Sequence, residues 1–557
     1  MKRAFIKPTL AAVFAAILAS SCGTTGPTIT STPIENIDQQ ALKTADLTET
    51  ELETWGSLDL VTDTIPGMSV QKAYREIIKD FQGKTVIVGV VDSGVDIEHE
   101  DLKNIIWTNE DEIPGNGIDD DKNGYVDDIH GWNFLGNTIK ENLEFVRILR
   151  DLKPKYDGKT ASEISAADQE EFALYQRAKE EYEKEYNDKK AGFDRYSAIK
   201  QQVTTAKKDV AAALGKEDFT AEDLKNIETE DTTVQQKAAF LLNIMNNVGG
   251  DVDEVLKQLQ GGIDYFQGGL ESHLNLELDG RKTGDDVNDI TDTNYGNNDV
   301  DGPDPKKEDA KHGTHVAGII AAQRNNNIGM NGVANNVKIM AVRAVPDGDE
   351  YDKDIALAIR YAVDNGAKVI NTSFGKYFSN HPEWVLDAIK YAAKKDVLIV
   401  NAAGNDALDM DVTRIYPNDQ TPENTEEIAD NFLTVGASNF EYGEGLVARF
   451  SNYGQTNVDV FAPGTKIWST TPNNEYQYLQ GTSMASPAVA GVAAIIRSYY
   501  PKLSAAEVKE VIMKSGLATP QEVIVGGDAD NVKPFAQLSV SGKMVNLYNA
   551  LIMASKM

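Results

Sequence analysis

The stretch TVIVGVVDSG, residues 85–94, is a continuously apolar run, rich in β-branched residues, that ends in a turn. Such a run is typical of a strand buried on both faces, as in a parallel sheet. Similar runs follow along the chain at residues 337–345, 367–375, 397–405, 432–438 and 458–464. The sequence therefore predicts a sheet of mostly parallel strands.

Amphipathic stretches separate these runs. Residues 354–366 and 382–396 carry apolar side chains three and four positions apart, and the first stretch closes on Gly366. This spacing predicts helices with one buried face. Strands that alternate with helices indicate an α/β fold, a doubly wound and mostly parallel sheet with helices on both faces.

The composition limits the classes of protein and partner. The chain has 557 residues, of which 41% are hydrophobic, and its formal net charge is -33. It can therefore bury a large core, and its acidic excess argues against nucleic acid as a partner. The acidic balance fits an exported, calcium-loaded protein. The single cysteine excludes an internal disulfide framework.

The first residues are typical of an export signal. Three cations within the first seven residues precede the apolar stretch LAAVFAAILA, residues 10–19, and Cys22 follows shortly after. The apolar stretch is too short for a permanent membrane-spanning helix. The pattern resembles a bacterial lipoprotein signal, in which residues 1–21 are removed and Cys22 is lipidated. The alternative is an ordinary secretory signal with a chance cysteine.

Two segments depart from the α/β pattern. Residues 22–54 begin with a stretch rich in Thr, Pro and Gly, which predicts a flexible tether, with order beginning near Trp55. Residues 139–280 lack strand patterns and are charged, with apolar side chains recurring at multiples of seven. We expect an all-α insertion, with helix starts at Ser165 and Thr220, where capping-box spacing occurs. It could be a plain appendage, control substrate access, restrain activity or bind a partner.

Three short stretches carry residues suited to nucleophilic hydrolysis. VVDSGVD places Asp92 at the end of the first strand, KHGTHVAG places His312 just before a helix, and GTSMASPAVAG places Ser483 at another loop-to-helix junction. Such chemistry needs a hydroxyl, an imidazole to take its proton and a carboxylate to hold the imidazole in the right tautomer. These three residues are therefore the candidate catalytic groups.

The three stretches resemble the signatures of the subtilases, the subtilisin-like serine endopeptidases. The chain order Asp, His, Ser is also that of subtilisin. The resemblance covers roughly residues 83–137 and 285–517, and it implies a subtilisin-like catalytic domain formed by residues 55–138 and 281–557. It assigns Asp92 as the residue that orients the base, His312 as the general base and acid, and Ser483 as the nucleophile.

The resemblance also implies an oxyanion donor and a substrate-binding segment. Asn405, in the sequence NAAGN, matches the asparagine that stabilises the tetrahedral intermediate. Ser373, Phe374 and Gly375 match the strand that pairs with the substrate backbone, and Gly404 is a further candidate substrate-binding residue. We therefore expect a peptide or protein substrate to bind by β-augmentation.

His312 and His315 stand three positions apart and could in principle be two metal ligands. A zinc site of the H-E-x-x-H type would also need a carboxylate on the helix, and Gly313 and Thr314 supply none. The resemblance assigns catalysis to His312 alone. We expect His315, one turn further on, to pack and hydrogen-bond inside the protein.

Two alternatives to an enzyme can be stated. The chain could be a binding module that keeps the fold to grip peptides, or a structural envelope lipoprotein whose insertion is the working part. The presence of nucleophile, base, orienting acid and oxyanion donor together favours the enzyme.

An acidic loop before the insertion predicts a structural calcium ion. Asp119, Asp121 and Asn123 follow the spacing that wraps oxygen ligands around calcium, and Asp127 or Asp128 could complete the shell. The twelfth-position glutamate of an EF-hand is missing, so the loop is of another type. The alternative is an acidic loop that is merely a solvated turn.

Asp101 is a candidate ligand of a second calcium ion. It matches an aspartate that in many subtilases binds calcium together with carbonyl groups of the loop after the catalytic helix. That loop is here RNNNIG, residues 324–329, which is one residue longer than the usual pattern. No organic cofactor is expected.

The remaining expectations concern location and regulation. The lipid at Cys22 would anchor the protein in the cell envelope of a Gram-negative bacterium, with the outer membrane favoured, and we expect a monomer. Too few residues separate Cys22 from Trp55 for the folded propeptide that most secreted subtilases carry. Two explanations compete: the enzyme matures without such a propeptide, or the insertion of residues 139–280 has taken over its restraining role, which is our hypothesis.

Overall fold

The computed structural model describes residues 29–35, 37, 43, 45–421 and 426–557. Cys22 and the predicted signal lie outside these residues. Within them, no helix combines the length and the hydropathy needed to cross a bilayer.

The centre of the molecule is a nine-stranded sheet. Its strand order is β10-β13-β7-β6-β5-β4-β1-β3-β2, and all neighbours pair in parallel except β10 with β13. The strands are β1 (Val86–Asp92), β2 (Gly131–Asn133), β3 (Val337–Arg343), β4 (Val369–Thr372), β5 (Leu398–Ala402), β6 (Phe432–Ser438), β7 (Val460–Pro463), β10 (Leu517–Ala518) and β13 (Lys543–Met544). The predicted mostly parallel sheet is confirmed.

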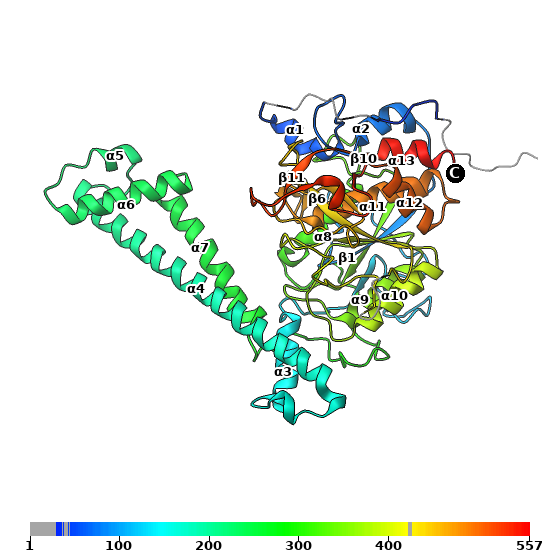
Figure 1. Ribbon diagram of the computed structural model, residues 1–557, viewed down its shortest axis with the longest axis horizontal. Coiled ribbons are helices and arrows are strands. Elements are labelled where there is room, and N and C mark those ends of the chain that lie inside the picture. Colours follow the sequence, from blue (N-terminus) through cyan, green and yellow to red (C-terminus); the bar gives the residue numbers. More distant parts are fainter. Residues whose placement is uncertain (1–28, 36, 38–42, 44, 422–425) are drawn as a thin grey trace, which may run out of the picture.

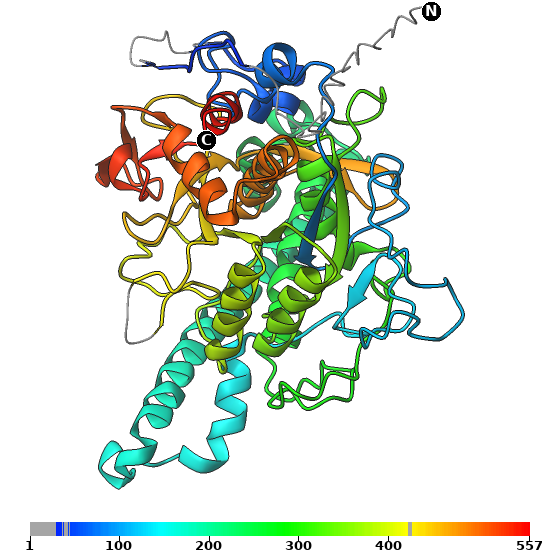
Figure 2. The ribbon, with the colours of Figure 1, turned by 90° about the vertical axis from the view of Figure 1, so that its right-hand side faces the viewer.

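Helices cover both faces of this sheet. One apolar cluster joins the sheet to helices α8 (Lys311–Ala321), α11 (Thr482–Tyr499), α12 (Ala505–Ser515) and α13 (Leu547–Ala554). A second cluster joins the other face to α9 (Asp352–Asp364) and α10 (Pro382–Lys394), which lie side by side (Figures 1 and 2). Neighbouring residues of β1 divide between the faces, since Val90 belongs to the first cluster and Val91 to the second. This alternation explains the continuously apolar strands.

The strand order predicts a binding crevice at the carboxyl ends of the central strands. β1 lies between β3 and β4, so the chain crosses from one side of β1 to the other after β3. Open α/β sheets bind ligands at such a switch point, beyond the carboxyl ends of the strands. Asp92 ends β1 at this point. Two small antiparallel pairs complete the body, β8 (Ile467–Thr471) with β9 (Glu475–Leu479) and β11 (Glu522–Ile524) with β12 (Val532–Pro534).

The insertion between Asp92 and His312 is helical, as predicted, and Figure 1 shows it projecting from the body. We call residues 139–280 the arm. Its helices are α3 (Glu144–Tyr156), α4 (Gln169–Leu214), α5 (Ala221–Lys225), α6 (Thr232–Val248) and α7 (Val252–Gly268). Thr220 forms the capping box expected at the start of α5. The 46-residue helix α4 contacts both α3 and α7, so it runs the length of the arm.

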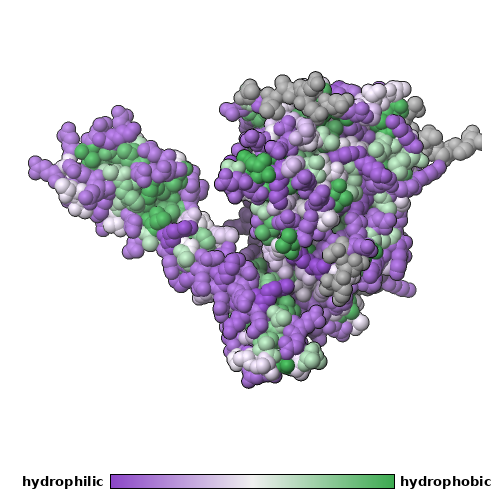
Figure 3. Space-filling view, in the orientation of Figure 1, coloured by the Kyte–Doolittle hydropathy of each residue, from purple (hydrophilic) through white to green (hydrophobic). Residues whose placement is uncertain are grey.

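The arm contains two separate apolar cores. The root core joins α3 and the start of α4 to the body through Phe378, which packs on Phe145. The tip core lies among the end of α4, α5, α6 and the start of α7, and Figure 3 shows apolar side chains gathered there. Between the cores, a side chain at Gly192 would overlap Phe266 and one at Gly262 would overlap Tyr196. These glycines let α4 and α7 approach closely.

The segment expected to be a flexible tether is partly structured. Helix α1 (Glu49–Thr54) begins at a capping box formed by Thr48 and Glu51. Ile37 is buried in an apolar cluster of the body, and the backbone N–H of Ile34 donates to Asn549 Oδ1 at 2.8 Å. Order therefore begins before Trp55. The Thr-x-x-Glu spacing of a helix start was the signal for it in the sequence.

Candidate active site

Asp92 and His312 form a hydrogen-bonded pair at the switch point, with Asp92 buried and His312 partly exposed. Asp92 is 1% exposed, and its Oδ1 accepts hydrogen bonds from His312 Nδ1 and from the backbone N–H of Ser93, both at 2.7 Å. His312 stands on the first turn of α8 with its side chain 39% exposed. Because Nδ1 carries the proton shared with Asp92, Nε2 is left as the proton acceptor.

The environment of His312 shifts its basicity in two directions. Burial lowers the pKa of the ring, while the charge and the hydrogen bond of Asp92 raise it. The carboxylate prevails, so the pKa of His312 lies above its usual value of 6.5. This is the direction expected of a base that must hold a proton during turnover.

Ser483 is the second residue of α11 and contacts the strand segment beyond β4. Its Oγ donates to the carbonyl oxygen of Ser373 at 3.1 Å, and the Ser373 hydroxyl donates to the carbonyl of Ser483 at 2.9 Å. Within the described residues, Ser483 makes no hydrogen bond to His312. Catalytic hydrogen bonds often form only when substrate binds, and rotation of one side-chain torsion would redirect the hydroxyl.

Asn405 is held in one orientation by the start of α11. Its Oδ1 accepts from the backbone N–H of Thr482 at 2.8 Å and from the Thr482 hydroxyl at 3.1 Å, so its amide nitrogen faces the other way. The side chain of Asn405 lies beside the start of α11, since a Cβ atom built on Gly481 would be 3.5 Å from both its Oδ1 and its Nδ2, and 3.6 Å from the backbone nitrogen of Ser483. The amide of Asn405 and the backbone N–H of Ser483 thus lie near one another at a helix N-terminus, and donors of these two kinds can stabilise an oxyanion.

The predicted substrate-binding segment has a free backbone edge. No backbone hydrogen bond within the described part of the chain engages Phe374 or Gly375, and Gly375 is exposed. Lys376, which follows, pairs with Tyr416 through two backbone hydrogen bonds of 2.8 and 2.9 Å. An extended peptide could therefore add to this edge.

The position of Gly404 indicates a supporting role. Its φ of +103° favours glycine, and its N–H donates to the Thr482 hydroxyl at 2.9 Å. Its carbonyl accepts from the backbone N–H of Asn452 at 3.0 Å. These contacts fix the loop that carries Asn405, and direct contact of Gly404 with substrate stays a prediction.

His315 is a buried structural residue. It is fully buried, and its Nε2 lies 3.1 Å from the carbonyl of Ile467 and 3.0 Å from that of Gln477, so it donates to both. Burial lowers the pKa of His315 to about 3, so the ring is neutral at physiological pH. It ties α8 to the β8–β9 hairpin, as the sequence led us to expect.

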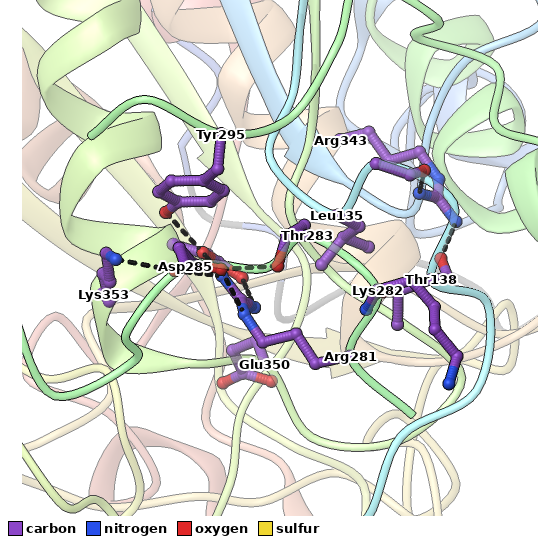
Figure 4. A network of polar contacts seen from close by, with 12 residues as sticks. Leu135, Thr138, Arg281, Lys282, Thr283, Asp285, Tyr295, Arg343, Glu350 and Lys353 are labelled. Carbon is purple, nitrogen blue, oxygen red and sulfur yellow. Dashed lines mark hydrogen bonds and ion pairs between the residues drawn. The ribbon is translucent and has the colours of Figure 1, made fainter. Parts of the chain in front are cut away.

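Arg343 holds the chain segments that carry Asp92 and His312. The sequence patterns did not indicate this role. It ends β3 and is 1% exposed, with Nε donating to the carbonyl of Ser93 at 3.0 Å and Nη2 to that of Thr138 at 2.8 Å (Figure 4). Its guanidinium also pairs with Asp309, just before α8, at 3.0 Å. Arg343 thus joins the loop after Asp92, the start of α8 and Thr138, the residue that precedes the arm. A lone arginine at the end of an apolar strand was the available signal.

The acidic loop brings two of the predicted calcium ligands together with one further carboxylate. Oxygens of Asp119, Asp121 and Glu112 lie within 4.8 Å of one another. Asn123 adjoins them, since its Nδ2 donates to Asp121 Oδ2 and to Asp128 Oδ2, both at 3.0 Å. Glu112 was missed because it precedes the motif, although it stands in the acidic run NEDE.

The structure also gives Asp127 and Asp128 different hydrogen-bond partners. Asp127 accepts hydrogen bonds from the backbone N–H groups of residues 115–117, so its carboxylate closes that turn. Asp128 is fully buried and accepts from Asn109 at 2.8 Å and from the hydroxyl of Tyr361 at 2.6 Å. Burial raises the pKa of Asp128 to about 6.

Asp101 lies against the loop that the resemblance pairs with it. Its Oδ1 accepts from Asn326 Nδ2 at 2.6 Å and its Oδ2 from the backbone N–H of Met330 at 3.2 Å. Asp101 is 1% exposed, and burial raises its pKa. The carboxylate of Asp101 therefore lies against the loop of residues 324–329, at a place distinct from the Asp119 loop.

The sheet, the Asp–His pair and the serine at the start of a helix, with an asparagine amide nearby, are the features of a serine-hydrolase site on an α/β scaffold. The Subtilase family matches residues 83–530, and the chain belongs to this family. This confirms the resemblance drawn from the three sequence signatures.

The matched relatives are proteases of bacteria and of a protozoan parasite. The chain is 46% identical to "Thermophilic serine proteinase" of Bacillus sp. (strain AK1) over 34% of this chain and 42% of that protein. It is 35% identical to "Cell wall-associated protease" of Bacillus subtilis (strain 168), over 43% and 25%. It is 34% identical to "Subtilisin-like protease 1" of Plasmodium falciparum, over 47% and 40%. The chain thus spans less than half the length of these curated relatives.

Among solved structures, a protease from Pseudoalteromonas arctica PAMC 21717 matches with a TM-score of 0.35 and 29% identity, over 44% of this chain and 70% of that chain.

Proposed function

We propose that this protein is a serine endopeptidase that hydrolyses peptide bonds through an acyl-enzyme. The observation that carries the proposal is the 2.7 Å hydrogen bond from His312 to Asp92, because it leaves Nε2 free to accept a proton at the cleft. The same cleft, of about 550 Å³, is lined by Asp92, His312 and Ser373, the residue that contacts Ser483.

The chemical steps follow from these positions. His312 Nε2 takes the proton of Ser483 as its Oγ attacks the peptide carbonyl carbon. The resulting oxyanion is stabilised by the amide of Asn405 and the backbone N–H of Ser483. His312 then gives its proton to the leaving amine, and an acyl-enzyme remains on Ser483. Water, deprotonated by His312, hydrolyses this ester and restores the serine.

The substrate would be a peptide or an extended segment of a protein. The open backbone edge at Phe374 and Gly375 can pair with a substrate strand, so main-chain hydrogen bonds supply affinity without a fixed sequence. This edge is also compatible with a binding module that grips peptides without cutting them.

A fluorophosphonate probe separates these two functions. Labelling of the folded protein that disappears in Ser483→Ala supports the enzyme. A folded, calcium-loaded protein that binds peptides but takes no label would show a binding module instead. Hydrolysis of casein by the wild type and not by Ser483→Ala gives a second, independent reading.

We also propose that calcium stabilises the Asp119 loop. Carboxylate oxygens of Glu112, Asp119 and Asp121 within 4.8 Å repel one another unless a cation or proton lies among them, and hard oxygen ligands suit calcium. Asn123 and Asp128 adjoin this cluster and could add oxygens. A second ion would use Asp101 and the loop of residues 324–329. Calcium would act as a structural ion that holds surface loops.

The remaining proposal is anchorage in the cell envelope through lipid on Cys22, with the outer membrane favoured. The charged and apolar residues before Cys22 support it. Labelling of growing cells with a radioactive fatty acid tests it, with Cys22→Ala as the unlabelled control. Fractionation would then assign the membrane, and light scattering of the released protein would test for a monomer.

A further inference from the structure

The root of the arm is joined to the substrate-binding segment by a buried ionic contact. Lys376 follows residues 373–375 directly and is 1% exposed in its side chain. Its Nζ lies 3.2 Å from Glu144 Oε2, on the first turn of α3, and 3.0 Å from Asp352 Oδ1. It also donates to the carbonyl of Glu350 at 2.8 Å. The ammonium group is therefore shared between the arm and the body.

The opposite side of the cleft is joined to the arm as well. Asp347 and Ile139 both line the cleft. The N–H of Asp347 donates to the carbonyl of Ile139 at 2.8 Å, and its carbonyl accepts from the N–H of Glu141 at 2.9 Å. Its carboxylate lies 2.9 Å from Nε2 of His273, at the other end of the arm. The arm thus contributes Ile139 to the lining of the cleft and holds the neighbouring residue Asp347 in place.

The root itself is fixed by buried charges. Arg147 of α3 pairs with Glu144 and donates to the carbonyls of Asp349 and Glu350, at 2.8 and 3.1 Å. Buried charges need close partners, so such a set favours one arrangement of the chain over others.

The chain leaving the arm is held in the same way. Arg281 bridges Asp285 and Asp354, both at 2.8 Å, and Lys353 pairs with Asp285 at 2.6 Å (Figure 4). Tyr295 donates to Asp354 from the same network at 2.6 Å. The chain at both ends of the arm is therefore held to residues 349–354, where α9 begins.

We propose that the root of the arm sets the spacing of the two cleft walls, with Lys376 as the positioning residue of the substrate-binding segment. This inference rests on the proposed peptidase function. Lys376 itself is not among the residues that line the cleft. It acts through the backbone of residues 373–375, which would pair with the substrate strand, so a displaced segment should bind the substrate more weakly.

Steady-state kinetics on a peptide substrate and the rate of labelling by a covalent probe together test the proposal. Lys376→Met should raise KM at least tenfold for an internally quenched peptide that fills the cleft. Its kcat and its rate of labelling by a small fluorophosphonate, which does not use the cleft walls, should change less than threefold. Lys376→Arg should keep KM close to the wild-type value, because arginine retains the positive charge.

Glu144→Gln is the milder partner variant and decides the question if Lys376→Met does not fold. It should raise KM in the same direction, and the double variant should resemble Lys376→Met alone, because the two residues act through one contact. The matched control is Lys509→Met on α12, which removes a buried ammonium group from its contacts with Glu427 and Asp459 and should leave KM unchanged.

Three outcomes have distinct meanings. An unchanged KM in folded Lys376→Met and Glu144→Gln overturns the proposal. So does an equal fall in kcat and in labelling rate, which would show general damage to the site. A wild-type protein that takes no label overturns the peptidase function itself, before any variant is compared.

Discussion

The hydroxyl of Ser483 donates to the carbonyl of Ser373 at 3.1 Å, and the hydroxyl of Ser373 donates back to the carbonyl of Ser483 at 2.9 Å. This reciprocal pair joins the start of α11 to the segment on which a substrate would lie. The nucleophile and the substrate edge therefore share a fixed distance before any substrate binds, which reduces the ordering needed during the reaction.

Asn405→Asp should reduce kcat by about 10²–10³-fold while the protein stays folded. The substitution keeps the oxygen that accepts from Thr482, at 2.8 Å, but replaces the donating amide with a second oxygen. A carboxylate facing a developing oxyanion repels it. Measured kcat and the unfolding midpoint check the prediction, and Asn405→Ala, which also removes the contact with Thr482, should cost more stability.

The pH dependence of activity should report His312. Only the neutral imidazole can accept the serine proton, so kcat/KM should fall as pH drops through the pKa of His312, which Asp92 raises above 6.5. Asp92→Asn should move this midpoint to lower pH and reduce kcat by about 10⁴-fold. A rate independent of pH between 5 and 9 would contradict the role of His312 as base.

His315 should govern stability in acid. Its pKa is about 3 in the folded protein and about 6.5 in the unfolded chain, so the unfolded state binds the proton more tightly between these values. The stability that this histidine contributes is therefore present above pH 6.5 and is lost as pH falls, by roughly 1.4 kcal/mol per unit. Denaturant unfolding at pH 7.5 and 5.5 measures this slope.

The matched variants for this prediction lie on one helix. His315→Leu should remove that slope and cost roughly 2–4 kcal/mol at neutral pH, because it leaves the carbonyls of Ile467 and Gln477 without their donor. His312→Ala, one turn earlier, should abolish turnover and keep the stability. A loss of turnover in both variants at equal stability would contradict the separation of their roles.

Local patterns explain what the sequence could predict. The apolar run ending at Asp92 defined a buried strand by its composition alone, and the histidine and serine motifs each carried their own flanks. Glu144 and Lys376 are 232 positions apart, and neither has an unusual neighbourhood in the sequence. Contacts of this kind depend on how the arm folds back on the body, so no local spacing could reveal them.

Chelation of calcium should lower thermal stability more than it lowers the initial rate. The Asp119 loop is not part of the cleft, and a bound ion stabilises the folded state by about 2.7 kcal/mol at a hundred times its Kd. Asp121→Asn should abolish this calcium-dependent shift in Tm, and Glu110→Gln, an exposed neighbour, should keep it. An immediate loss of turnover on chelation, restored by calcium without any change in folding, would contradict the structural role.

Removing only the tip of the arm should leave peptide hydrolysis unchanged within about twofold. Tyr196 of α4 and Gly262 of α7 lie in contact, so a short Gly/Ser loop can replace residues 197–261. This deletion removes the tip core but keeps the root core and the contact between Glu144 and Lys376.

The comparison with a full deletion then separates two roles of the arm. Replacing residues 140–278 also removes Glu144 and leaves the buried ammonium of Lys376 one partner short, so KM should rise. If the arm instead restrains the enzyme, the tip deletion should raise kcat on casein several-fold. Loss of activity in a folded tip deletion would contradict both roles, because the tip core does not reach the cleft in this structure.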